Sequence, residues 1–317
     1  MRFLKKFKVD IRYRQMLEYC NGPIYSFLPS WSPDGAFVSL VAERGQGLEF
    51  VCIPAAKLLR EKDDMFDGNF EKAEVLYANG EKVDQSAWNP INKRVSAGVV
   101  ESEKGQIIKE FGTGDELGME RTLVGQAIAA QPSYAPDGRC MVFVAEWPPT
   151  SNPVKNFSLR IMNCENGESE EFLSHTGQCL WQPRWSPDGS MIAYVSYMGR
   201  KRGSRVKVID IETGKEHAVR PLSLWPGVMC QENPTWGPDG RCLAFLEHYV
   251  GSKISPHMDG ISVIIKDMNT GKSVDLKAQE DGKGVMGDLA WRPGTNTLLC
   301  RVEDGLVALH LEITEPR

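Results

Sequence analysis

Short segments that alternate between apolar and polar residues, or run apolar throughout, recur along the whole 317-residue chain. A period of two bounded by Gly, Pro and Asp is typical of β-strands rather than helices. Five of the most apolar segments directly follow a turn signature and are expected to be buried strands: Phe37 to Val41, Met141 to Ala145, Met191 to Val195, Leu243 to Leu246 and Leu298 to Val302. The pattern predicts an all-β protein.

An aromatic residue stands at the head of that turn signature six times. The copies are WSPDG at Trp31, WNPIN at Trp88, YAPDG at Tyr134, WSPDG at Trp185, WGPDG at Trp236 and WRPGT at Trp291. Proline presets φ, aspartate bonds its own backbone and glycine accepts a positive φ, so PDG predicts a tight turn between two strands. Successive copies are 57, 46, 51, 51 and 55 residues apart, which is the period of a propeller blade of about four strands.

The two ends of the chain predict how the circle closes. Only two strand patterns follow Trp291, so the sixth blade lacks its outermost strand, while Phe7, Val9, Ile11 and Tyr13 alternate with polar residues and have no blade of their own. An N-terminal strand joining the last blade would complete it. The sequence therefore predicts a single domain over residues 1–317, a six-bladed β-propeller of four-stranded blades.

Composition narrows the possible partners and cofactors. The net charge of −5 and the pI near 5.7 argue against nucleic acid as the main partner, because phosphate-binding surfaces carry clustered Lys and Arg. The eight cysteines contain no CxxC pair and are expected to be core residues, with no metal site, disulfide framework or cofactor. No apolar run suits a signal peptide or a membrane span. The expectation is a soluble cytoplasmic protein, or a periplasmic one if a leader has been removed.

The aromatic-x-P-D-G turn is preceded by proline two positions earlier in FLPSW, AQPSY, WQPRW and ENPTW. This combination resembles the WD-like propeller repeat of the TolB family, which includes the periplasmic Tol translocation protein and the propeller domains of prolyl oligopeptidase-type enzymes. The resemblance covers nearly the whole chain and implies the fold rather than an activity. The chain has no GxSxG motif and no room for a hydrolase domain, so it is not expected to be such a peptidase.

Propeller topology predicts which loops share a face. If PDG turns join the first two strands of every blade, the links from second to third strand and from blade to blade gather at the opposite end. Tryptophan, tyrosine and arginine are favoured at interface hot spots, so this end is the expected partner-binding face. Its candidates are Trp147, His175, Trp181, Arg200, Arg202, Trp225, His248, Tyr249 and His257. Alternatively, Trp181 and Trp225 fill gaps between blades and the basic run is a solvated hairpin.

A polar column recurs three residues before five of the six anchoring aromatics. It consists of Gln85, Gln131, Gln182, Asn233 and Asp288. These positions fall on the innermost strands and are expected to line the central channel, where polar groups can hold water. A bound ligand or ion is the alternative. A separate insertion, residues 54–76, interrupts the strand rhythm and is expected to form a short helix on the rim.

These features predict a non-catalytic scaffold that binds a protein or peptide, as a subunit of a larger assembly, and no catalytic residue is assigned. The alternative is a metal-assisted carbohydrate-active lyase or hydrolase, because oligogalacturonate lyase is a propeller with related repeats whose metal is held by several histidines. That alternative requires His175, His248 and His257, or several carboxylates, to converge in a pocket.

Overall fold

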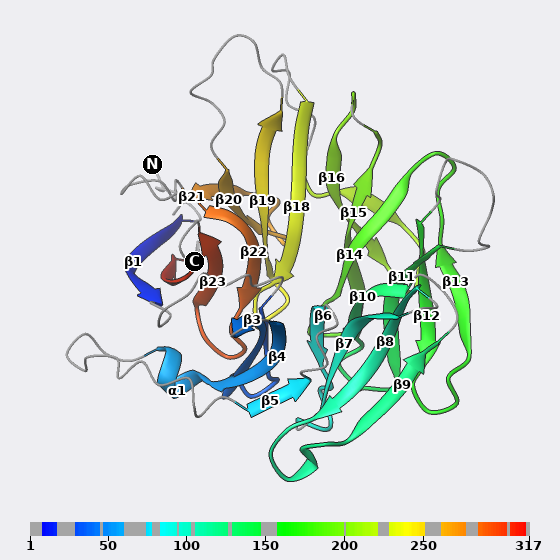
Figure 1. Cartoon of the computed structure of the whole chain (residues 1–317). Coiled ribbons are helices and arrows are strands. Elements are labelled where there is room, and N and C mark those ends of the chain that lie inside the picture. Colours follow the sequence, from blue (N-terminus) through cyan, green and yellow to red (C-terminus); the bar gives the residue numbers. More distant parts are fainter. Residues whose placement is uncertain are drawn as a thin grey trace, which may run out of the picture.

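Six four-stranded antiparallel sheets form a six-bladed β-propeller (Figure 1). The computed structural model describes residues 8–17, 29–44, 47–59, 74–77, 83–93, 95–102, 105–125, 129–146, 157–199, 201–220, 228–250, 261–276, 285–302 and 305–314. The all-β fold predicted from the turn repeat is confirmed.

Each blade runs from its innermost to its outermost strand in chain order. Blade 1 contains β2 (Ser30–Trp31), β3 (Phe37–Arg44), β4 (Gly47–Pro54) and β5 (Glu74–Tyr77). Blade 2 contains β6 (Val83–Trp88), β7 (Val95–Ser102), β8 (Gly105–Gly112) and β9 (Glu120–Val124). Blade 3 contains β10 (Ala129–Tyr134), β11 (Cys140–Glu146), β12 (Phe157–Asn163) and β13 (Ser169–Leu173). Blade 4 contains β14 (Cys179–Trp185), β15 (Met191–Tyr197), β16 (Ser204–Asp210) and β17 (Glu216–Ala218). Blade 5 contains β18 (Val228–Trp236), β19 (Cys242–Val250), β20 (Ser262–Asp267) and β21 (Ser273–Leu276).

Blade 6 combines strands from both ends of the chain. It contains β22 (Val285–Trp291), β23 (Thr297–Val302), β24 (Gly305–Thr314) and, as its outermost strand, β1 (Lys8–Leu17). The β1–β24 pair is antiparallel and runs from Lys8 opposite Thr314 to Leu17 opposite Leu306. In Figure 1 the blue first strand lies beside the red last strands. Ring closure by the N-terminal strand is confirmed.

The hydrophobic core is divided among the contacts between neighbouring blades. In one such cluster, Val206 and Val208 of blade 4 pack with Trp236 and Phe245 of blade 5, all at most 7% exposed. Burying both faces of a sheet in this way explains why the strands read as apolar runs. The cysteines of β19 and β23, Cys242 and Cys300, lie in the cluster that joins blades 5 and 6, as expected of small core residues.

The PDG turns contact one another around the ring. An added Cβ at Gly240, Gly189 or Gly138 would meet Pro187, Pro136 or Ile91 of the preceding blade's turn, at 3.7, 3.2 and 2.8 Å respectively. The three glycines also have φ values of 70°, 79° and 68°, a region that favours glycine. The turn conformation therefore favours glycine at all three positions, and the neighbouring turn also leaves little room for a Cβ at Gly138 and Gly189.

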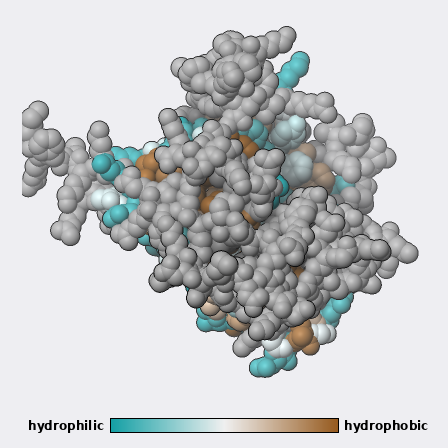
Figure 2. Space-filling view, turned by 60° about the vertical axis from the view of Figure 1, so that its left-hand side comes forward, coloured by the Kyte–Doolittle hydropathy of each residue, from teal (hydrophilic) through white to brown (hydrophobic). Residues whose placement is uncertain are grey.

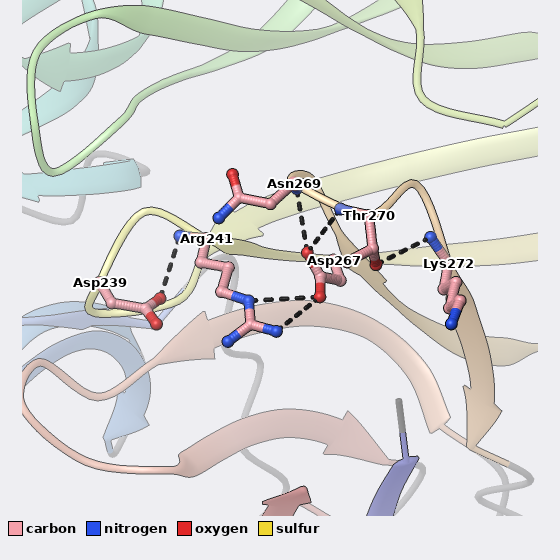
Figure 3. Close-up of polar contacts among 6 residues, drawn as sticks. All are labelled: Asp239, Arg241, Asp267, Asn269, Thr270 and Lys272. Atoms are coloured by element: carbon pink, nitrogen blue, oxygen red, sulfur yellow. Dashed lines mark hydrogen bonds and ion pairs between the residues drawn. The ribbon is translucent and has the colours of Figure 1, made fainter. Parts of the chain in front are cut away.

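A buried ion pair ties the PDG turn of blade 5 to the outer hairpin of the same blade (Figure 3). Asp267, which is fully buried, accepts hydrogen bonds from Arg241 Nε at 3.2 Å and Nη2 at 2.7 Å. Its other carboxylate oxygen accepts from the backbone N–H groups of Asn269 and Thr270. One carboxylate thus holds two successive turns in place.

The insertion after β4 begins with a short helix, as predicted. Its described helix, α1 (Ala55–Leu58), is a single turn, and Leu59 packs against the cluster that contains Trp31. No side chain caps the helix N-terminus, which is consistent with its short length. Residues 60–73 of the insertion lie outside the described residues, and residues 74–76 belong to β5.

Candidate functional site

The two ends of the propeller carry different connections. The strand order places every PDG turn at one end, here named the turn face, together with the links from third to fourth strand. The links from second to third strand and from blade to blade lie at the other end, here named the loop-rich face. His175 and Arg202 fall in such links. The predicted division of loops between two faces follows directly from this topology.

An aromatic cluster lies at the loop-rich end of blades 3 and 4. The Trp181 ring stacks on Phe157 with 5.7 Å between ring centroids and meets Tyr197 edge-on at 6.2 Å. Trp181 nevertheless remains 36% exposed. One side of the ring therefore fills a gap between blades 3 and 4, as one interpretation of the sequence expected, while the other side stays accessible.

Apolar surface is scarce elsewhere on the described residues. In the view of Figure 2, the coloured atoms that are visible include a few small apolar areas, shown in brown. Of the described residues, three large apolar side chains are exposed: Ile91, Leu117 and Trp181. Ile91 and Leu117 fall in links at the turn face. Trp181 is thus the exposed large apolar side chain that the described part of the chain places on the loop-rich face.

His175 is held by a polar cluster in blade 4. Its Nε2 lies 3.0 Å from Glu216 Oε2, which also accepts hydrogen bonds from Tyr194 Oη and from Lys207 Nζ at 3.4 Å. Burial favours a raised pKa for the Glu216 carboxyl, but the hydrogen bonds from Tyr194 and His175 bring that pKa below its ordinary value. The arrangement joins the link after blade 3 to the outermost strand of blade 4.

His248 belongs to a different cluster, which the sequence did not predict. It lies directly opposite Cys230 in the β18–β19 pair, and ligand atoms of Cys230, Glu232 and His248 all lie within 4.8 Å of one another. The adjacent imidazole of His248 lowers the pKa of the Cys230 thiol, and the adjacent thiol raises the pKa of the imidazole. The signal in the sequence is the C-x-E alternation on one strand, but only the hairpin register reveals its histidine partner.

The polar column has an unexpected backbone conformation. Gln131, Gln182, Asn233 and Asp288 have φ values of 58°, 49°, 53° and 45°, the left-handed region that non-glycine residues rarely adopt. Each lies at a bulge in the pairing of the innermost strand with the next. These bulges could not be read from the residue types.

Side chains of this column bond from blade to blade. The Gln131 side-chain oxygen accepts from the backbone N–H of Gln182, and the Gln182 side-chain oxygen accepts from the backbone N–H of Asn233 at 2.7 Å. Asp288 instead pairs with Arg301 Nε at 2.9 Å. The described members therefore bond within the protein, a role beyond the expected lining of a channel. The side chain of Gln85 lies outside the described residues.

Several predicted interface residues cannot be placed. Trp147, Arg200, Trp225 and His257 lie outside the described residues, and Tyr249 is described only by its backbone in β19. Of the three predicted interface histidines, the two that are described, His175 and His248, belong to separate clusters. No candidate helix for crossing a membrane was found among the described residues.

The fold and its closure define a six-bladed β-propeller whose last blade is completed by the first strand. No protein-family model matches the sequence. The chain is 24% identical over 281 residues to an uncharacterized protein of Agrobacterium fabrum, across 76% of this chain and 90% of that protein. A 73-residue segment is 37% identical to the Tol-Pal system protein TolB of Histophilus somni, covering 23% of this chain and 15% of TolB.

Solved structures show the same fold. A putative TolB from Agrobacterium tumefaciens matches with a TM-score of 0.63 and 16% identity over 93% of this chain and 92% of that one. TolB from Acinetobacter baumannii matches with a TM-score of 0.60 and 18% identity over 90% of this chain, which spans 65% of that structure. An oligogalacturonate lyase in complex with manganese matches with a TM-score of 0.57 and 13% identity over 96% of each chain. The fold is TolB-like.

Proposed function

We propose that this chain is a non-catalytic propeller scaffold that binds a protein or peptide through its loop-rich face, as a subunit of a larger assembly. The observation that carries the proposal is the partly exposed Trp181, supported from behind by Phe157 and Tyr197. A rigidly held aromatic side chain loses little entropy on binding and is a frequent interface hot spot. The similarity to TolB, a protein of the Tol-Pal system, also supports a role in an assembly.

Charge supports the choice of partner. Arg202 is exposed in the link between β15 and β16 of blade 4, the blade that also carries Trp181. An arginine at the rim of an interface would steer an approaching partner. The net charge of −5 favours a protein over nucleic acid. Trp147, Trp225, Tyr249 and the remaining predicted loop residues complete the proposed face. The same proposal places the protein in the cytoplasm, or in the periplasm after removal of a leader, and cell fractionation tests this location.

The test compares exposed apolar residues on opposite faces. Trp181→Ala removes the accessible ring from the loop-rich face, and Leu117→Ala removes a side chain that is 53% exposed at the turn face. Each tagged protein is used for quantitative affinity purification from native extract, with folding checked by circular dichroism. A stoichiometric partner should be recovered with wild type and Leu117→Ala, and be depleted with Trp181→Ala. Equal recovery with all three proteins contradicts the proposed face.

The lyase or hydrolase alternative has less support. It rests on the similarity in fold to oligogalacturonate lyase, and an identity of 13% carries the fold alone. It also requires His175, His248 and His257, or several carboxylates, to converge, whereas His175 pairs with Glu216 in a cluster separate from that of His248. The hydrogen bond between this histidine and Glu216, on the outermost strand of blade 4, favours the scaffold.

A further inference from the structure

Three chemically different metal-binding side chains meet at the loop-rich end of blade 5. Cys230 and Glu232 are two residues apart on β18, so they share one face of the strand. His248 on β19 is the cross-strand partner of Cys230. Their sulfur, oxygen and nitrogen atoms all lie within 4.8 Å of one another, and Cys230 is a free thiol.

The neighbouring blade holds this cluster in place. Gly203, with φ of 72°, lies so close to β18 that a Cβ there would be 2.0 Å from the carbonyl oxygen of Met229. This contact brings the next residue, Ser204, to the cluster, where its hydroxyl donates to Glu232 Oε1 at 3.5 Å. The site is therefore built from two blades, and a supporting hydroxyl orients one of its ligands.

One nitrogen of the cluster is left without a partner. His248 Nδ1 is buried and has no hydrogen bond among the described residues. Leaving a buried polar atom without a partner destabilises a folded protein. This atom is an independent indication that something binds to the histidine.

We propose that Cys230, Glu232 and His248 bind Zn²⁺, with the fourth position open to water or to a donor from a bound partner. Thiolate, imidazole and carboxylate are the three ligand types that zinc accepts, and three protein ligands leave one tetrahedral position vacant. A thiolate and a carboxylate supply two negative charges, which the ion neutralises. Sulfur ligation selects zinc over magnesium or calcium, which prefer oxygen.

The spacing of the ligand atoms fits this ion after a small adjustment. Zinc bonds of about 2.0–2.3 Å in a tetrahedron place neighbouring ligand atoms about 3.4 Å apart. From their limit of 4.8 Å, the atoms of the cluster need to approach one another by at most about 1.4 Å, which small side-chain rotations provide. The site is independent of the proposed scaffold function, because metal binding requires no partner.

The first test titrates the full-length protein with Co²⁺ as a spectroscopic probe and with Zn²⁺ in competition. Wild type should bind one equivalent with a thiolate-to-cobalt charge-transfer band, and Zn²⁺ should displace it. Cys230→Ser should abolish the band, while Glu232→Gln and His248→Gln should weaken binding by roughly 100-fold, since even outer-shell changes cost about 10–100-fold. The matched control is Cys164→Ser, another partly buried cysteine, which should bind as wild type does. Retention of the band in Cys230→Ser overturns the proposal.

The second test requires no variant, and so does not depend on the folding of any substituted protein. Wild type is treated with iodoacetamide with and without Zn²⁺, and modification of the peptide containing Cys230 is measured by mass spectrometry. Zinc should protect Cys230 at least tenfold and leave Cys164 unchanged. If Cys230 is alkylated at the same rate with and without zinc, whether that rate is high or low, the proposed metal site is overturned.

Discussion

Gln182 makes two hydrogen bonds to Asn233 in the next blade. Its Nε2 donates to Asn233 Oδ1 at 2.7 Å, and its Oε1 accepts from the backbone N–H of Asn233 at 2.7 Å. Both residues have positive φ, which costs roughly 1–2 kcal/mol for a residue with a Cβ. The bonds between blades offset this backbone strain, which explains why a long amide recurs at a bulge where glycine would be easier to accommodate.

Replacing Gln182 by alanine should lower the free energy of unfolding by about 2 kcal/mol, because the backbone strain stays while both hydrogen bonds are lost. The loss of one of them leaves the backbone N–H of Asn233 without its partner. Gln182→Gly should cost about 1 kcal/mol less than Gln182→Ala, since glycine relieves the strain. Urea unfolding measures both. The reverse order, with glycine worse than alanine, is the usual result in a strand and would contradict the strained conformation.

Deleting residues 1–17 should lower the unfolding temperature and increase aggregation, because it removes β1 and exposes the edge of β24. Deleting only residues 1–7, which leaves β1 intact, is the control. Differential scanning calorimetry and light scattering measure the two effects. If both truncated proteins melt together with wild type, β1 contributes nothing to the ring.

Trp236→Ala should destabilise the protein by about 3–5 kcal/mol as a large-to-small core change. Trp236 is 7% exposed and its Nε1 donates to Arg184 O in the preceding blade at 3.0 Å. Trp185 is only partly buried and its Nε1 donates to Gly189 O in its own turn, so Trp185→Ala should cost less. Chemical denaturation of both variants tests this ranking. Equal losses would show that the bond to the neighbouring blade adds nothing.

Acid should weaken the Arg241–Asp267 pair. Burial favours a raised pKa for Asp267, but the bonds from Arg241 and the Thr270 backbone lower it below 3.8. The ionised Asp267 carboxylate therefore stabilises the folded protein at pH values above 3.8, the ordinary pKa that applies to the unfolded chain. This contribution is lost as the pH falls through the lower pKa of the folded state. Asp267→Asn should cost about 3 kcal/mol at pH 7, with a smaller difference from wild type near pH 3.

Urea unfolding at several pH values measures this difference. The control is Arg241→Gln, in whose background Asp267→Asn should have a smaller effect. A difference between wild type and Asp267→Asn that stays constant with pH would show that the charge of Asp267 does not stabilise the turns.

The fold could be predicted from sequence because its strongest signals are local. The turn signature and the apolar strand after it identify each blade without knowledge of any distant contact. The indole N–H groups of Trp31, Trp88 and Trp236 then join neighbouring blades by donating to backbone oxygens. The site was less accessible to sequence reasoning. The Cys230–His248 pair depends on register across a hairpin, where a slip of one residue would turn one side chain to the other face.

The polar column shows a different limit. Its recurrence pointed to the innermost strands, but glutamine has no preference for positive φ, so residue type gave no sign of the bulges at Gln131 and Gln182. The pairing of these amides depends on contacts between residues 51 positions apart. Side-chain hydrogen bonds between repeats cannot be seen within any one repeat.

The pairing of Lys8 with Thr314 also sets the order of events during synthesis. The first strand of the propeller leaves the ribosome long before its hydrogen-bonding partner is made. At roughly 5–20 residues per second, β1 waits about 15–60 s for β24. Through that interval its unpaired edge is open to other nascent chains or to a chaperone, and the last blade is completed only after β24 has been made.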